Sequence, residues 1–214
     1  MKVQAFIFDM DGVIVDSMPY HVRAWELYLK RLGRDASALN QRMHGKHNDQ
    51  LLREYFGESL PIHDIQRMGS EKEALYRELI QEELEQHLLP GVREFLSKHA
   101  EMPKAVASNA EEANVNFVLD QAGLRQHFLY AVNGQQVEFG KPNPEIYLKT
   151  AELLQIEANK CIVFEDSQAG IDAAVGAGMK VVAINSHRTT LIGQAIEADH
   201  FLDTRLQEWL AQQL

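Results

Sequence analysis

Acidic and polar side chains directly follow short apolar segments of the sequence. Asp9-Met10-Asp11-Gly12 follow Val3–Phe8, Ser108-Asn109 follow Ala105–Ala107, and Glu165-Asp166 follow Cys161–Phe164. Carboxylates that converge from separate strands repel one another unless a cation lies between them. Mg²⁺ prefers a few carboxylates together with water and phosphate oxygens. The pattern therefore predicts a site for a divalent cation and a phosphorylated ligand.

A lysine in the segment Gly140-Lys141-Pro142 adds a positive point charge suited to a phosphoryl group. Taken singly, each feature has a simpler interpretation. Lys141 alone would more often be a solvated surface residue, and Asp9-Met10-Asp11-Gly12 alone is equally well a polar turn. The combination at several strand ends favours a functional site.

The elements that must position these residues form an α/β pattern. Four apolar runs with little alternation predict buried strands at Val3–Phe8, Ala105–Ala107, Cys161–Phe164 and Val181–Ile184. Helical patterns separate the last three, over residues 111–122, from Asn143-Pro144 onward, and over residues 169–177. This alternation predicts a Rossmann-like parallel sheet with helices on both faces. Ligands of such sheets bind beyond the carboxyl ends of the strands.

Residues 17–87 break the alternation. A structureless loop of that length is improbable in a compact domain, and Val22, Trp25, Leu29 and Leu32 recur at helical spacing. We therefore predict an α/β catalytic core of residues 1–16 and 88–214, with an inserted helical cap domain of residues 17–87.

The net charge, the single cysteine and the apolar runs of the sequence indicate which partners and which cellular compartment to expect. The 31 acidic and 21 basic residues give a formal net charge of −10, which argues against nucleic acid or an anionic membrane as a partner. The single cysteine, Cys161, lies in an apolar run and is expected to be a buried, inert thiol. No secretory h-region or membrane-spanning run is visible. We expect a cytoplasmic monomer or small homo-oligomer that acts on a small molecule.

In this order, the motifs resemble those of the haloacid dehalogenase superfamily. Ser108 resembles the second motif of that superfamily. Three segments are similar to its branch of β-phosphoglucomutases and sugar-phosphate phosphatases: DMDGVIVDS from Asp9, GKPNP from Gly140, and FEDSQAG from Phe164. The resemblance covers the whole chain and implies a Rossmann-like core with a helical cap inserted after the first motif.

The resemblance also implies a role for each motif residue. Asp9 would be the nucleophile that forms an aspartyl-phosphate, and Asp11 would be the general acid and base. A second aspartate at this spacing suits phosphoryl transfer and argues against dehalogenation. Mg²⁺ would be held by the Asp9 side chain, the Asp11 backbone carbonyl and Asp166, with Glu165 as a ligand or a support. The residues implied in phosphate binding are Gly12, Ser108, Asn109 and Lys141.

Residues of the cap bear on the choice between phosphatase and mutase. His21, followed by Trp25 four residues later, resembles a histidine near the acid/base aspartate of the mutases, but it fits a packed helix face equally well. The mutases carry a glycine followed three residues later by an arginine that binds the distal phosphate. Here Gly45 matches, but Asn48 stands in place of the arginine and supplies no cationic clamp.

We therefore expect a Mg²⁺-dependent phosphatase of small phosphorylated metabolites, and among these we expect sugar phosphates. A β-phosphoglucomutase-type mutase is the alternative. A non-enzymatic phosphate or metabolite sensor on the same fold is an alternative of another class.

Overall fold

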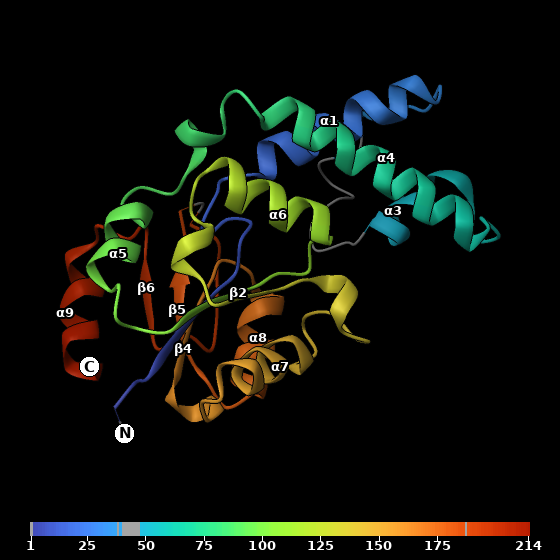
Figure 1. The fold of residues 1–214 in the computed structure, drawn as a ribbon. Helices are drawn as coiled ribbons and strands as arrows, with labels where there is room; N and C mark the ends of the chain where they lie inside the picture. Colours follow the sequence, from blue (N-terminus) through green and yellow to red (C-terminus); the bar gives the residue numbers. More distant parts are fainter. Residues whose placement is uncertain (1, 38, 40–47, 187) are drawn as a thin grey trace. The chain divides into compact units, whose positions relative to one another are not determined.

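A parallel sheet forms the centre of the computed structural model, which describes residues 2–37, 39, 48–186 and 188–214 (Figure 1). Its strands lie in the order β3-β2-β1-β4-β5-β6, and every neighbouring pair is parallel. The strands are β1 (Ala5–Phe8), β2 (Lys104–Ala107), β3 (Tyr130–Val132), β4 (Cys161–Glu165), β5 (Lys180–Ile184) and β6 (Ile196–Ala198).

The four predicted strands are the central ones, and the sequence pattern missed the two edge strands, β3 and β6. Each edge strand has only three residues, and only one of the three is buried. Tyr130 in β3 is 41% exposed. An edge strand pairs on one side only, so it lacks the continuous apolar run by which a central strand is recognised.

The two faces of the sheet are packed differently. On one face, alanines and aliphatic residues of β1, β2, β4 and β5 contact α7 (Glu145–Leu154) and α8 (Gln168–Gly176). On the other face, Phe6, Phe8 and Phe164 pack against Phe95 of α5 (Val92–Lys98). Figure 1 shows α5 and the α7–α8 pair on opposite sides of the strands. The predicted Rossmann-like class is therefore confirmed.

The part of the chain that forms the sheet also contains two further α-helices and four short 3-10 helices. These are α6 (Glu112–Gln121), α9 (Thr204–Gln213), η1 (Leu84–His87), η2 (Arg125–His127), η3 (Gly134–Gln136) and η4 (Ala158–Lys160).

Polar side chains near the first turns of α7 and α8 accept hydrogen bonds from the backbone. α7 begins at Glu145, one residue later than predicted, with Pro144 at the cap position. Asn143 still contributes, because its Oδ1 accepts a hydrogen bond from the Glu145 backbone N at 3.0 Å. At the start of α8, Ser167 Oγ accepts a hydrogen bond from the Gly170 backbone N at 3.1 Å. Such caps satisfy the free N–H groups of a first helical turn.

The described residues divide into two compact units, residues 1–16 with 84–214, and residues 17–83. The boundary lies four residues before the predicted one. Val15 pairs antiparallel with Leu88, and Asp16 N donates to His87 O at 2.8 Å. These hydrogen bonds join η1 and the residues after it to the first unit, which explains the difference.

The second unit is helical. It contains α1 (Met18–Arg31), α3 (Asn48–Phe56) and α4 (Ile62–Ile80), and α4 contacts both of the others. Its interior includes Trp25 and Tyr28 of α1 and Leu51 and Leu52 of α3, all of them buried. Pro19 lies in the first turn of α1, where a proline does not interrupt the helix.

Candidate active site

Carboxylates lie at the ends of adjacent central strands. Phe8 of β1 pairs in register with Val106 of β2 and with Phe164 of β4. Asp9 follows Phe8, and its backbone N donates to Phe164 O at 2.9 Å. Glu165 is the last residue of β4, at the same level as Asp9. Because all strands are parallel, these side chains meet at one edge of the sheet.

Lys141 joins the two carboxylates. Its side chain is buried, and its Nζ lies 2.6 Å from Asp9 Oδ1 and 2.6 Å from Glu165 Oε1. Its backbone N donates to Asn109 Oδ1 at 3.0 Å, which fixes the loop before α7. The predicted surface alternative for Lys141 is therefore wrong, because the ammonium is enclosed between two buried carboxylates.

Glu165 is fully buried and accepts five hydrogen bonds. Its Oε1 accepts from Lys141 Nζ at 2.6 Å and from the Tyr147 hydroxyl at 2.8 Å. Its Oε2 accepts from the backbone N of Asp166 at 3.0 Å, from the backbone N of Ser167 at 3.1 Å and from Ser167 Oγ at 3.0 Å. A buried charge requires this degree of hydrogen bonding.

Two glycines make room for the acidic side chains. A Cβ at Gly170 would lie 1.8 Å from Glu165 Oε1, and a Cβ at Gly12 would lie 2.0 Å from Asp166 Oδ2. Gly12 also has a φ of +82°, in the left-handed region that L-residues avoid. Both positions therefore need glycine for the carboxylates to sit where they do.

The electrostatics of the site follow from burial and like charge. Burial raises the pKa of Asp9 to about 7; Lys141 opposes this increase, while Glu165 and Asp11 add to it. Burial and the neighbouring Glu165 and Asp9 also raise the pKa of Asp166 well above its usual value. Burial acts in the same direction on Glu165, but the adjacent Lys141 ammonium outweighs it and lowers the pKa of Glu165.

The arrangement fits a divalent cation. Carboxylate oxygens of Asp9, Glu165 and Asp166 lie within 4.8 Å of one another. Lys141 contacts two of these three carboxylates. The pKa values of Asp9 and Asp166 are raised first by burial and then by the neighbouring carboxylates, so a cation among them would be stabilised. Oxygen ligands of this kind suit Mg²⁺.

The other predicted core residues lie beside this cluster. Asp11 is half-buried and forms an isolated bridge with Val15, and its charge acts on Asp9. Ser108 is buried after β2, and its Oγ accepts a hydrogen bond from the Ala110 backbone N at 3.1 Å. Asn109 is half-buried and joined to Lys141 as described.

In the helical unit, His21 and Asn48 belong to one polar cluster. His21 Nδ1 lies 2.7 Å from Lys72 Nζ, and its ring stacks on Tyr76 with the ring centroids 3.9 Å apart. Asn48 Nδ2 donates to Glu73 Oε1 at 2.7 Å, and Lys72 Nζ donates to the same oxygen at 2.9 Å. Lys72 is 1% exposed, so this is a buried ion pair.

This cluster holds Glu73 ionised. Burial raises the pKa of Glu73, but the charges of Lys72 and His21 and the hydrogen bond from Asn48 outweigh it and lower the pKa to about 2. Gly45, the remaining predicted cap residue, lies outside the described residues. The substrate-binding roles of His21, Gly45 and Asn48 stay predictions.

Sequence reasoning missed Tyr147, Lys72 and Glu73. Tyr147 lies on the apolar face of α7, where it resembles a packing residue. The available signal was its hydroxyl, because a buried tyrosine normally finds a hydrogen-bond partner. Lys72 and Glu73 follow one another in a charged stretch of α4, which is typical of a solvated helix face.

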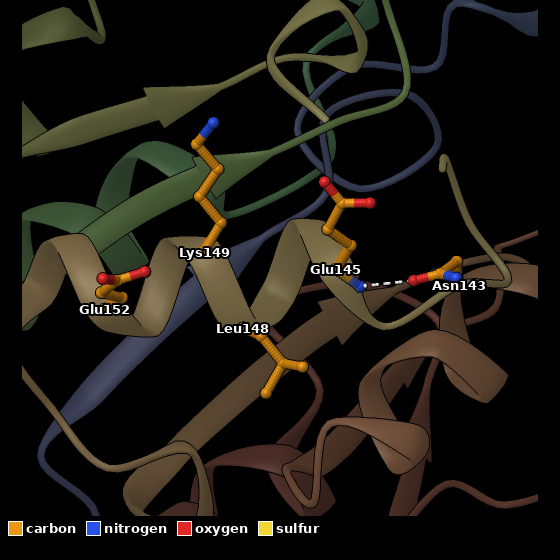
Figure 2. Close-up of a pocket in the computed structure, with 5 residues that line it drawn as sticks. All are labelled: Asn143, Glu145, Leu148, Lys149 and Glu152. Atoms are coloured by element: carbon orange, nitrogen blue, oxygen red, sulfur yellow. Dashed lines mark hydrogen bonds between the residues drawn. The ribbon is translucent and has the colours of Figure 1, made fainter. Parts of the chain in front are cut away.

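A surface hollow along α7 is separate from the carboxylate cluster. Figure 2 shows the residues that line it, which are Glu145, Leu148, Lys149 and Glu152 of α7 and Asn143 of the loop before it. Leu148 is 45% exposed, and the carboxylate of Glu145 accepts hydrogen bonds from the backbone N of Glu138 and of Phe139, both at 2.9 Å. The Glu145 carboxylate therefore stabilises the loop before α7.

A parallel sheet that gathers three carboxylates and a lysine at its strand ends defines an α/β enzyme suited to phosphoryl transfer. Residues 3–178 match the family described as haloacid dehalogenase-like hydrolase. The chain belongs to this family, as the motifs of the sequence indicated.

Relatives narrow the enzyme class. A phosphorylated carbohydrates phosphatase of Thermotoga maritima is 34% identical, with 83% of each chain covered. A fructose-1-phosphate phosphatase of Escherichia coli is 32% identical over 86% of this chain and 97% of its own. A crystal structure of β-phosphoglucomutase from Clostridium difficile has 29% identity, a TM-score of 0.82 and 98% coverage of both chains. The chain is therefore a phosphohydrolase or phosphomutase, and the non-enzymatic sensor is not supported.

Two expectations from composition concern Cys161 and membrane spans. Cys161 is buried in β4, and burial raises the pKa of its thiol to about 11, as expected for an inert thiol. In the part of the chain that the structure describes, no helix combines the length and the apolar character needed to cross a membrane.

Proposed function

We propose that the protein is a Mg²⁺-dependent phosphatase of small phosphorylated metabolites, and that its substrates are sugar phosphates. The observation that carries the proposal is the buried Lys141 ammonium, which contacts Asp9 and Glu165 at the strand ends. A fixed positive charge beside a carboxylate nucleophile is what phosphoryl transfer requires, because most of its catalysis is positioning and charge stabilisation.

The proposed reaction has two steps through Asp9. A carboxylate oxygen of Asp9 attacks phosphorus, the bond to the ester oxygen breaks, and Asp11 gives that oxygen a proton. Asp11 then takes a proton from water, whose oxygen attacks phosphorus. The bond between phosphorus and Asp9 breaks and releases inorganic phosphate, which restores the free carboxylate.

The metal and the other residues complete the proposal. Asp9, Asp166 and the backbone carbonyl of Asp11 would hold Mg²⁺, which neutralises charge on the phosphoryl oxygens when it is bound. The five donors around Glu165 favour a role in supporting Lys141 over a role as a direct ligand.

Four residues would bind the phosphoryl group without forming a covalent bond to it. Ser108, Asn109 and Lys141 would hold its oxygens, and Gly12 would let the backbone approach it closely.

The phosphatase is favoured over the mutase by Asn48. A mutase must hold a second phosphate, and an arginine is suited to that task. Here Asn48 donates to the Glu73 carboxylate, so the position carries a neutral amide beside a negative charge. The β-phosphoglucomutase likeness keeps the mutase as the second candidate.

The test is a panel of phosphorylated sugars and polyols, followed by ³¹P NMR with Mg²⁺ and with a chelator. The spectrum resolves inorganic phosphate from isomerised sugar phosphate in one sample. The panel includes fructose 1-phosphate, β-glucose 1-phosphate and inorganic pyrophosphate. Asp9→Asn serves as the inactive control.

We expect Mg²⁺-dependent release of phosphate that exceeds isomer formation for every sugar phosphate. Conversion of β-glucose 1-phosphate to glucose 6-phosphate faster than phosphate release would establish the mutase instead. Turnover that survives Asp9→Asn would remove Asp9 from the role of nucleophile.

A further inference from the structure

Tyr147 is a fully buried tyrosine in the first half of α7. It lies six residues after Lys141 in the chain. Its neighbours in the core include Ile146 and Ala151 of the same helix and the alanines of β1 and β2. The ring therefore packs as an apolar residue, while its hydroxyl reaches the polar end of the sheet.

Tyr147 contacts both members of the Lys141–Glu165 ion pair. Its hydroxyl donates to Glu165 Oε1 at 2.8 Å, and Lys141 Nζ lies 4.9 Å from the centroid of its ring. The same Nζ lies 2.6 Å from Glu165 Oε1 and 2.6 Å from Asp9 Oδ1. A cation over an aromatic face is attracted by the ring quadrupole.

The two oxygens of Glu165 are held differently. Oε2 accepts from two backbone N–H groups and from the Ser167 hydroxyl, so the local chain fixes it. Oε1 accepts from the side chains of Lys141 and Tyr147. Tyr147 and Lys141 therefore both restrain Oε1, and Lys141 also donates a hydrogen bond to Asp9.

The Lys141 ammonium is shared between two carboxylates, and the hydrogen bond from Tyr147 to Glu165 affects how it is shared. An ammonium has three N–H donors, and two of those of Lys141 are directed to Asp9 and Glu165. In a buried site, hydrogen bonds to ions are strong and depend on one another. Without the Tyr147 hydroxyl, Glu165 Oε1 would draw the ammonium closer, away from Asp9 and from a phosphoryl group on it.

We propose that Tyr147 is a positioning residue for phosphoryl transfer, which holds Glu165 and Lys141 so that the ammonium faces Asp9. This inference rests on the proposed function. It predicts that Tyr147 matters more to the transition state than to the bound ground state, because the ammonium acts on charge that develops during transfer.

The test compares Tyr147→Phe, which keeps the ring, with Tyr28→Phe as a matched control. Tyr28 is also buried, and its hydroxyl also donates to a carboxylate, Glu71 Oε2, at 2.6 Å. Both variants lose one tyrosine–carboxylate hydrogen bond, but Tyr28 belongs to the helical unit, whereas Tyr147, Lys141 and Glu165 belong to the unit that contains the sheet.

Four quantities are measured with a substrate of the wild type: kcat, KM, inhibition by orthovanadate and inhibition by inorganic phosphate. Vanadate adopts the trigonal-bipyramidal geometry of the transferring group, whereas phosphate represents the ground state. For Tyr147→Phe we expect about a tenfold loss in kcat and in vanadate affinity, the size of one hydrogen bond to a charged group. KM and phosphate inhibition should change less than about twofold, because ground-state binding is retained. Tyr28→Phe should match the wild type in all four.

If Tyr147 only stabilised the fold, Tyr147→Phe would give a different result. A smaller folded fraction lowers the apparent kcat, but it leaves the ratio of the vanadate and phosphate inhibition constants unchanged. An unchanged ratio in Tyr147→Phe, or wild-type kcat, overturns the inference while the phosphatase proposal stands. If the wild type releases no phosphate from any substrate of the panel, the proposed function fails first, and the inference fails with it.

Discussion

A single methyl group at Gly170 should disrupt the Lys141–Glu165 pair. Gly170 lies in the first turn of α8, and a Cβ there would lie 1.8 Å from Glu165 Oε1 and 2.3 Å from Oε2. Non-bonded atoms do not approach this closely, so the carboxylate must move. Glu165 cannot move freely, because both of its oxygens accept hydrogen bonds in a closed interior.

The magnitude follows from the contacts that are lost. Displacing Oε1 breaks its hydrogen bonds from Lys141 and Tyr147, and bonds to a charged group contribute about 1.5 to 3 kcal/mol each. Alanine is favoured over glycine inside a helix by about 1 kcal/mol, which offsets part of the loss. We therefore expect Gly170→Ala to lower the free energy of unfolding by about 2 to 5 kcal/mol.

Gly176→Ala, in the same helix, is the matched control. A Cβ there has Pro144 Cβ as its nearest neighbour at 3.6 Å, an ordinary van der Waals contact. It should stabilise the protein by about 0.5 to 1 kcal/mol through helix propensity alone. Urea unfolding without metal, followed by circular dichroism, measures both variants, and phosphate release measures function. Equal stability of the two variants would refute the position assigned to the Glu165 carboxylate.

Three further outcomes are expected. Asp9→Asn should reduce phosphate release at least about a thousandfold in steady-state assays, because it removes the nucleophile. Without metal, the wild type should lose stability as the pH rises toward and through about 7, since the pKa of Asp9 is raised from 3.8 to about 7 by burial above all. The loss extends from about pH 4 to about pH 7, and roughly three pKa units correspond to about 4 kcal/mol over that range. Thermal unfolding at pH 5 and pH 8 covers about two of these units and should show a loss of about 3 kcal/mol, which Mg²⁺ should reverse. Glu73→Ala should destabilise the protein by about 3 to 5 kcal/mol in urea unfolding, because it removes one half of the buried Lys72–Glu73 ion pair.

The sequence predicted the parts of the fold in which one signal dominates. Central strands such as β1 and β4 are buried on both faces, so their apolar runs are unbroken. The edge strands β3 and β6 are too short and too exposed to give that signal. The helical unit ends four residues before the predicted boundary, and hydrogen bonds between residues far apart in sequence, such as Asp16 N to His87 O, join the intervening residues to the other unit.

In the candidate site too, residues with a local sequence signal were predicted and residues that depend on distant partners were not. Asp9 and Glu165 were predicted because each follows a predicted strand and carries a charge. Lys141 was predicted because its charge lies in the segment Gly140-Lys141-Pro142, just before a predicted helix. Asn48 donates a hydrogen bond to Glu73, which lies 25 positions away in the sequence, and no local pattern reveals that Glu73 is buried. Tyr147 was hidden for the opposite reason, because its ring satisfies the apolar pattern of α7 and only its hydroxyl is polar.

The unequal faces of the sheet connect the packing to the site. Phenylalanines of β1 and β4 fill the face toward α5, whereas the face toward α7 is lined by small residues such as Ala5, Ala105 and Ala107. Small side chains let a helix lie close to a sheet. A close α7 is what allows Tyr147, and Lys141 just before the helix, to reach carboxylates on β4 and after β1. We therefore expect the alanines of the strands to contribute to the position of the ammonium by setting how closely α7 packs on the sheet. A larger residue at one of these alanines would act on the site through the distance of α7 from the sheet, without touching any charged group.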